Sequence, residues 1–247
     1  MSELKFPTEM VELPSKGLVY PEDNPLSSGQ IEIKYMTAKE EDILTNQNYI
    51  KDGTVIDKLL QSLIISKVDY NDIILGDKNA IMVAARILGY GKDYTFEYKD
   101  EEVTIDLTTL KLNYLDESKL LEKNSNKFTF TMPATNTEIE FKILTGKDEK
   151  LIKQEIKGLQ RLNKLASPEL STRLKHMILS VNGDTERKTI RDFVDNYCLA
   201  RDSKALRDYI RSFQPDIDLT FNYEGNDGIE EVSLPMTVTF FWPDADL

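Results

Sequence analysis

The feature that most constrains this chain is an internal repeat. Residues 29–44, GQIEIKYMTAKEEDIL, align without a gap with residues 137–152, TEIEFKILTGKDEKLI, and six of the last fourteen aligned positions are identical. A second echo follows in each half, because residues 93–98 read DYTFEY and residues 218–223 read DLTFNY. The offset grows from 108 to 125 positions, so the second copy carries additional residues between the two echoes. The sequence therefore predicts two diverged copies of one structural unit.

Length and composition fit a folded protein rather than a disordered or membrane-spanning one. The 247 residues can bury a sizeable core, and 40% hydrophobic with 30% charged residues is typical of a soluble globular chain. No apolar run approaches the about 20 residues that a membrane span requires, and the N-terminal MSELKFPTEM lacks a signal-peptide pattern. The single cysteine, Cys198, excludes an internal disulfide and suits a reducing compartment. We expect a cytoplasmic protein with no membrane partner.

The net charge of −12 bears on the kind of partner. A protein that binds a nucleic-acid duplex normally presents a basic surface to the phosphates, so we expect no direct nucleic-acid partner. The acidic residues are mixed with lysine and arginine along the sequence rather than concentrated, which argues against DNA mimicry. An acidic balance of this kind indicates good solubility or a basic protein partner.

Each copy of the repeat predicts a strand followed directly by a capped helix. Alternating apolar and polar residues over 31–36 are typical of a half-buried strand. Thr37 and Glu40 then have the spacing of a capping box, in which each side chain binds the backbone amide of the other residue. Thr145 and Asp148 occupy the equivalent positions in the second copy. Helices should therefore begin at both points.

The rest of each unit is predicted as helices and then a hairpin. In the first copy, apolar residues recur at helical spacing over 55–66, and Asp77 is placed as the N-cap of a later helix that stops at Gly89. The corresponding elements of the second copy are a helix over 168–181 and a cap at Asp202. The second copy also has a longer first helix and one added helix. These extra segments span 146–165 and 186–199, and the hairpin strands span 94–98, 103–107, 219–223 and 231–234.

The predicted fold class is α+β, with two strand–helices–hairpin units related by a pseudo-twofold axis. A short strand at 18–20 is expected to pair with the strand at 31–35, as the strand at 128–132 pairs with 138–143. The expected segments are an irregular N-terminal segment with a short strand at 1–28, a first repeat at 29–107, a connector and hairpin strand at 108–135, a second repeat at 136–240, and an acidic tail at 241–247.

No motif in the sequence indicates an enzyme. His176 and Cys198 are the single histidine and cysteine, and both have apolar neighbours that favour ordinary structural roles. One residue of each type also falls short of a zinc site. Residues 89–92 lack the spacing and the strand-first context of a phosphate-binding loop, and the acidic runs at 40–42 and 100–102 lack calcium-ligand spacing. We expect no catalytic residue, no cofactor and no metal.

Two segments carry residues suited to protein binding. Prolines and an aromatic residue form a stiff, turn-rich segment near the N-terminus, and three consecutive aromatic residues lie near the C-terminus. Aromatic residues dominate the energetics of many interfaces. The alternative is that both segments pack on the chain's own core. The candidate partner-binding residues are Pro14, Tyr20, Pro21, Phe240, Phe241 and Trp242.

The N-terminal sequence resembles a known family. LPSKG at 13–17, the Tyr20–Pro21 pair and the segment 31–44 match a pattern of an LPS-G-x-x-Y-P opening, a strand and a T-x-x-E-E helix start. This pattern is similar to that of the T4-like bacteriophage baseplate proteins, in particular the baseplate hub assembly proteins. The resemblance covers the N-terminal quarter of the chain.

The resemblance implies a non-enzymatic role in building the central hub of a contractile phage tail. The first hypothesis is a chaperone-like assembly factor that binds hub or tail proteins transiently in the host cytoplasm and is absent from the finished particle. Its two related units would bind two related surfaces on partner proteins or mediate a homo-oligomer. The alternatives are a permanent structural subunit of the baseplate hub in the virion tail, and an enzyme without a recognisable motif, which would need a pocket with converging titratable groups.

Overall fold

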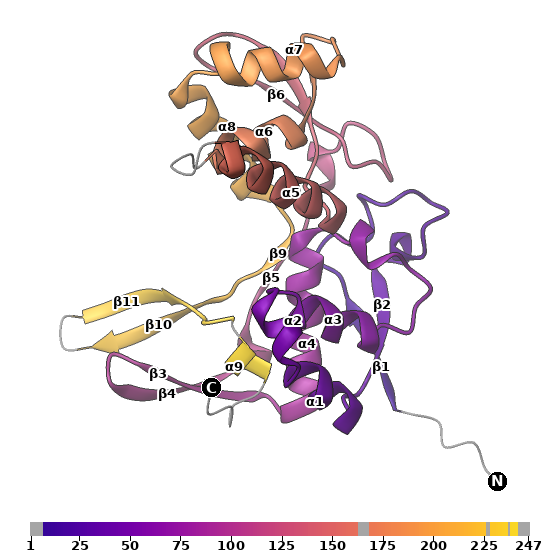
Figure 1. The fold of residues 1–247 in the computed structure, drawn as a ribbon, viewed down its shortest axis with the longest axis vertical. Coiled ribbons are helices and arrows are strands. Elements are labelled where there is room, and N and C mark those ends of the chain that lie inside the picture. The colour runs from indigo at the N-terminus through magenta and orange to yellow at the C-terminus, as the bar shows by residue number, and fades with distance from the viewer. Residues whose placement is uncertain (1–6, 163–167, 226–227, 237, 242–247) are drawn as a thin grey trace.

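The computed structural model describes the chain except residues 1–6, 163–167, 226–227, 237 and 242–247. It contains both helices and short antiparallel sheets, which agrees with the predicted α+β class. Figure 1 shows a first lobe at the lower right, a second lobe at the top, and an arm of two hairpins that projects to the left. None of the helices in the described ranges is long and apolar enough to cross a membrane.

The first lobe combines a two-stranded sheet with helices. Its elements are β1 (Thr8–Glu12), the 3-10 turn η1 (Pro25–Ser28), β2 (Gln30–Lys34), α1 (Ala38–Leu44), α2 (Gln47–Lys51), α3 (Val55–Leu63), the 3-10 turn η2 (Tyr70–Asp72) and α4 (Leu75–Tyr90). β1 and β2 pair antiparallel with Val11 opposite Ile31. Ile33 bridges to Ile64, which directly follows α3. Because successive side chains of a strand alternate between faces, Ile31 and Ile33 both point into the core, where they are fully buried.

The second lobe is built around a three-stranded antiparallel sheet in the order β6-β7-β8. Its elements are β6 (Phe128–Thr131), β7 (Glu138–Phe141), α5 (Gly146–Leu162), α6 (Glu169–Met177), β8 (Ile178–Val181), α7 (Arg187–Asp192), the π-helical turn η5 (Phe193–Tyr197) and α8 (Ala200–Phe213). Phe128 and Phe141 stack with ring centroids 5.5 Å apart, and Phe213 from α8 lies 5.0 Å from Phe128. These buried rings join the sheet to the last helix of the lobe.

The arm and the junction come from segments far apart in the sequence. Their elements are β3 (Asp93–Tyr98), β4 (Glu101–Asp106), the 3-10 turns η3 (Leu107–Thr109) and η4 (Glu117–Lys119), β5 (Leu112–Asn113), β9 (Asp216–Ile217), β10 (Thr220–Gly225), β11 (Gly228–Ser233) and α9 (Val238–Phe241). β3–β4 and β10–β11 are the predicted hairpins, and each pairs antiparallel over six residues per strand. The short pair of β5 with β9 ties the connector to the chain that leaves the second lobe.

The predicted helix over 168–181 is wrong in its last turn. α6 ends at Met177, and the next four residues form β8, with Ser180 opposite Glu140 of β7. The apolar residues of this segment have helical spacing, but β7 would otherwise expose the backbone groups of one edge. Pairing β8 with that edge satisfies those groups, and local periodicity does not report such long-range pairing.

The predicted strand at 18–20 is also wrong. The partner of β2 is β1, which begins ten residues earlier, and the segment 13–20 instead forms a series of turns closed by hydrogen bonds such as Lys16 N to Leu13 O at 2.8 Å. Gly17 has φ 76°, and a Cβ at that position would clash with the backbone carbonyl of Ser27. The turns therefore require a residue without a side chain at Gly17.

Several predicted helix ends shift by a few residues. Asp77 and Asp202 are not N-caps but the third residues of α4 and α8, which are preceded by Ile74 and Leu199. The stop assigned to Gly89 falls at Gly91, whose φ is 84°. Of the remaining predicted helices, 55–66 ends at residue 63, 146–165 is described as helix to 162, and 186–199 divides into α7 and the π-helical turn η5.

Candidate functional site

The capping box that follows β2 is anchored by a third residue. Thr37 N and Thr37 Oγ1 donate to Glu40 Oε2 at 3.0 and 2.6 Å, and Lys34 Nζ donates to Glu40 Oε1 at 2.7 Å. Glu40 is fully buried. Burial alone would raise the pKa of this carboxyl, but the hydrogen bonds from Lys34 and Thr37 outweigh it and lower the pKa. Glu40 is therefore charged and fixes the turn from strand to helix.

The same three contacts occur after β7. Thr145 N and Thr145 Oγ1 both donate to Asp148 Oδ2 at 3.0 Å, and Lys142 Nζ donates to Asp148 Oδ1 at 2.7 Å. Burial raises the pKa of the Asp148 carboxyl and these donors lower it, with a net lowering. Asp148 therefore fixes the turn from strand to helix in the second lobe, as Glu40 does in the first lobe. Both predicted helix starts are confirmed.

Thr37→Ala and Thr145→Ala should each lower the free energy of unfolding by about 1 kcal/mol, the usual cost of deleting a cap. The reason is the loss of one hydroxyl donor to a partly or fully buried carboxylate in each lobe. Urea denaturation followed by circular dichroism measures the change. Thr45→Ala, at an exposed helix end, is the matched control and should change stability by less than about 0.5 kcal/mol. If neither cap variant differs from this control, the two helix starts do not depend on the capping boxes.

A buried hydrogen-bond network fixes the N-terminal LPSKG segment to α4. Asp77, which is 0% exposed, accepts from Ser15 N at 2.9 Å, from Ser15 Oγ at 2.7 Å and from Tyr20 OH at 2.6 Å. Tyr20 OH in turn accepts from Ile74 N at 3.1 Å. Burial raises the pKa of the Asp77 carboxyl against the lowering effect of its donors, and burial together with the Asp77 charge raises the pKa of Tyr20. This motif therefore has a structural role here.

The N-terminal candidate residues are placed differently from one another. Pro14 and Tyr20 are buried, and only Pro21 is exposed. Tyr20 cannot present its ring to a partner in this structure because its hydroxyl is held by Asp77. The structural role of Ser15 and Tyr20 depends on Asp77, which lies 62 and 57 positions later in the chain. No local sequence pattern indicates this pairing.

The C-terminal aromatic residues pack inside the molecule as far as they are described. Phe240 and Phe241 are fully buried and lie edge to face with ring centroids 5.2 Å apart. Phe240 also meets Tyr94 of β3 at 4.8 Å, and the Tyr94 hydroxyl donates to Pro235 O at 3.0 Å. In this structure Phe240 and Phe241 therefore pack on the chain's own core and are not available to a partner. Trp242 and residues 243–247 of the predicted tail lie outside the described residues.

Aromatic side chains hold the two hairpins of the arm against each other. Phe96 and Phe221 meet edge to face at 5.4 Å, and Tyr98 and Tyr223 at 5.0 Å. The hydrogen bonds are reciprocal. Tyr98 OH donates at 3.3 Å to Glu230, the residue opposite Tyr223, and Tyr223 OH donates at 2.7 Å to Glu101, the residue opposite Tyr98. The arm is thus a two-layer element with an aromatic interior.

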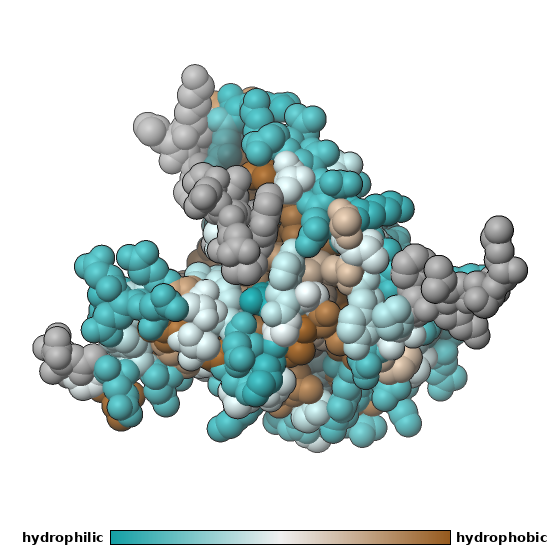
Figure 2. All heavy atoms as spheres, turned by 90° about the horizontal axis from the view of Figure 1, so that it is seen from below, coloured by the Kyte–Doolittle hydropathy of each residue, from teal (hydrophilic) through white to brown (hydrophobic). Residues whose placement is uncertain are grey.

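This arm as a whole is strongly acidic. Its described strands and the β3–β4 turn carry nine carboxylates and one lysine, Lys99, against a net charge of −12 for the whole chain. In Figure 2 the arm at the left is covered mainly by hydrophilic residues. The expectation that acidic residues are mixed rather than concentrated is wrong for this part, because folding brings two acidic segments together. The carboxylates are those of Asp93, Glu97, Asp100, Glu101, Glu102, Asp106, Glu224, Glu230 and Glu231.

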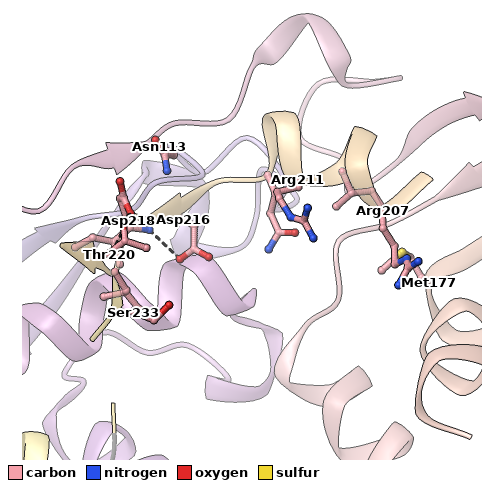
Figure 3. Close-up of a pocket in the computed structure, with 12 residues that line it drawn as sticks. Asn113, Met177, Arg207, Arg211, Asp216, Asp218, Thr220 and Ser233 are labelled. Atoms are coloured by element: carbon pink, nitrogen blue, oxygen red, sulfur yellow. Dashed lines mark hydrogen bonds between the residues drawn. The ribbon is translucent and has the colours of Figure 1, made fainter. Parts of the chain in front are cut away.

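An open cleft of about 530 Å³ lies between α8 and the base of the arm. Arg207 and Arg211 line it from α8, and Asp216 and Asp218 line it from the opposite side (Figure 3). Burial raises the pKa of Asp216, whose carboxylate accepts from Asn79 Nδ2 at 2.9 Å. Among the described lining residues, Thr220 Oγ1 donates to Asp218 Oδ1 at 2.7 Å, and none is a histidine, cysteine or lysine.

The single histidine and cysteine take part in ordinary contacts. His176 Nε2 lies 2.8 Å from Glu155 Oε2, which links α6 to α5. Cys198 is half-buried, and burial raises the pKa of its thiol, which disfavours the reactive thiolate. Within the described ranges, no group of three or more His, Cys, Asp or Glu side chains is arranged to hold a metal ion.

Comparison with known proteins identifies no relative for this architecture. No protein-family model matches the chain, and no curated protein or solved structure matches it significantly.

Proposed function

We propose that this protein is a non-enzymatic assembly factor for the baseplate hub of a contractile phage tail, which acts by protein–protein binding in the host cytoplasm. The N-terminal resemblance gives the phage context, and the acidic arm gives the mode of action. The arm carries this proposal because it projects to the left of the first lobe in Figure 1 and its outer carboxylates are mostly exposed. Within the described chain only a few of its carboxylates have cationic partners.

The chemistry of the arm indicates a partner with a basic surface. Exposed carboxylates steer a basic protein towards the arm and suppress acidic competitors. Ile229 adds an apolar side chain that is 71% exposed beside Glu230 and Glu231. An apolar anchor within a charged rim is a common arrangement at protein interfaces. The expected partner is a hub or tail protein with a basic groove and an apolar pocket.

Two diverged copies of one unit are the second part of the proposal. Three correspondences support it. Val11 opposite Ile31 and Phe130 opposite Ile139 occupy the same register of β1–β2 and β6–β7. α3 and α6 each span nine residues and precede a residue that pairs with the preceding strand. Asp77 and Asp202 are both buried at the third position of a helix.

The contact between the hairpins supports a pseudo-twofold relation between these units. In a twofold contact, residues near the axis meet their own counterparts, and a contact of residue i with residue j is matched by a contact of j with i. The pairs Phe96–Phe221 and Tyr98–Tyr223, with their exchanged hydrogen bonds to Glu230 and Glu101, follow that rule. The arm is then the place where the two units meet.

Ala134→Ser should raise the free energy of unfolding by about 1 kcal/mol, the net value of one hydrogen bond. Ala134 N donates to Asp202 Oδ1 at 2.7 Å, as Ser15 N donates to Asp77, but Asp202 Oδ2 has no hydrogen-bond partner among the described residues. A serine hydroxyl would supply what Ser15 supplies in the first unit. Urea denaturation measures the change, and Asp202→Ala in the same background should abolish the gain. A loss of stability in Ala134→Ser would mean that the two turns are not equivalent.

Co-expression with hub and tape-measure proteins, followed by affinity purification, tests the binding function. We expect at least one of them to co-purify with the wild type at low salt and to be lost with Glu97→Gln/Glu102→Gln/Glu231→Gln. Lys188→Gln/Arg191→Gln/Arg201→Gln, three exposed changes on the second lobe, is the control and should retain binding. Failure of every hub and tail protein to co-purify with the wild type would contradict the proposal.

A further inference from the structure

α5 carries a continuous basic stripe on its outer face. Its five cations are all exposed, whereas its three acidic residues point inward and pair with Lys142, Arg173 and His176. At about 3.6 residues per turn the five cations fall within roughly one third of the helix circumference, opposite the buried Ile152. The stripe consists of Lys147, Lys150, Lys153, Lys157 and Arg161.

The cations of this α5 stripe are not neutralised within the chain. Among the described residues, no salt bridge involves any of the five. The positive charges of the α5 stripe act electrostatically on a neighbouring carboxyl group, that of Asp69. A hydrogen bond from the Asn71 backbone lowers the pKa of Asp69, and the charges of Lys150 and Lys147 lower it further. An exposed positive surface on a chain of net charge −12 is suited to an acidic ligand.

The acidic arm carries an excess of negative charge, which is complementary to the positive charge of the α5 stripe. Glu97 and Glu102 lie directly opposite each other on its outer face, where like charges destabilise a strand pair. A cationic partner would relieve this repulsion. Leu151 and Leu162 are exposed beside the α5 stripe, whereas the exposed Ile229 of the arm lies on the outer face of β10–β11, away from Glu97 and Glu102.

We propose that the acidic arm of one copy of this protein docks along the α5 stripe of a second copy. The dimensions agree, since a six-residue strand is about 20 Å long and a 17-residue helix about 25 Å. No described ion pair joins the arm to α5 within one chain, so both surfaces are free for this contact. The contact is head-to-tail, because a different surface of each copy takes part. It does not depend on the phage assignment.

Sedimentation velocity of the purified, nuclease-treated full chain tests this contact. We expect concentration-dependent oligomers in 50 mM NaCl, and an apparent affinity weaker by about tenfold or more in 500 mM NaCl, where the Debye length is well below that at low salt. Lys150→Gln/Lys153→Gln/Lys157→Gln removes three of the five cations of the α5 stripe, and Glu97→Gln/Glu102→Gln/Glu231→Gln removes three of the nine carboxylates of the arm. Each variant alone should be monomeric, and their 1:1 mixture should form a dimer that grows no further, because each retains one of the two surfaces.

Matched controls separate this contact from misfolding and from other occupants. The Lys188→Gln/Arg191→Gln/Arg201→Gln control removes three positive charges, as the α5-stripe variant does, and should oligomerise like the wild type. The arm variant should melt at the same temperature as the wild type or higher, because the Glu97–Glu102 repulsion is gone. A wild type that stays monomeric, a variant mixture that stays monomeric, or assembly that is lost on nuclease treatment would each overturn the proposal, and the last would assign the stripe to nucleic acid.

Discussion

Replacing Asp77 with alanine is expected to lower the free energy of unfolding by about 3 kcal/mol, which is the effect of leaving several buried donors without an acceptor. Ser15 N, Ser15 Oγ and Tyr20 OH all donate to this one carboxylate. Each unsatisfied donor costs about 1–3 kcal/mol, and the removal of a buried carboxyl offsets part of the sum. Chemical denaturation monitored by circular dichroism provides the measurement.

Asp202→Ala is the matched comparison for this variant. It removes an equally buried aspartate at the same position of α8, but only the Ala134 N–H loses its acceptor. The expected cost is about 1 kcal/mol or less. If the two variants were equally destabilised, the network around the N-terminal LPSKG segment would not be the source of the Asp77 effect.

Phe240→Ala should cost about 3–5 kcal/mol, the range for truncating a large buried aromatic residue. The Phe240 side chain is fully buried between Tyr94 and Phe241, where no small movement of neighbours fills the space that its ring leaves. Thermal unfolding should reveal a clear fall in the melting temperature. Because Tyr94 begins the arm, we also expect the near-ultraviolet signal of the aromatic interior to weaken.

Tyr197→Ala serves as the control for Phe240→Ala. This tyrosine is 60% exposed, so its loss should change stability by no more than about 0.5 kcal/mol. A Phe240→Ala protein as stable as this control, but impaired in partner binding, would contradict the core assignment and restore the docking interpretation of the C-terminal aromatic residues.

The helix starts and the hairpins could be predicted from sequence because their determinants are local. Thr37 and Glu40 are three residues apart, and so are Thr145 and Asp148, so the capping contacts need no distant partner. The α+β class followed from the same short-range patterns. Lys34 and Lys142 were missed as members of these sites, although each lies three residues before the threonine, at the end of the strand or directly after it.

Long-range partners decided the features that the sequence did not predict. β8 is a strand because the edge of β7 is available, although its residues also continue the helical spacing of α6. Tyr20 can be buried because Asp77, 57 positions later, accepts a hydrogen bond from its hydroxyl group. The first arm segment, 93–106, is already acidic in the sequence, with six carboxylates and one lysine. What the sequence does not show is that this segment packs against 220–233, which adds the carboxylates of Glu224, Glu230 and Glu231 to the same arm.

Quantitative mass spectrometry of infected cells and of purified phage particles tests the assembly-factor proposal most directly. The proposal predicts that the protein is abundant in the cell lysate, sediments there with hub intermediates, and is absent from mature particles. A stoichiometric copy in every mature particle would contradict it and would establish a permanent structural subunit of the baseplate.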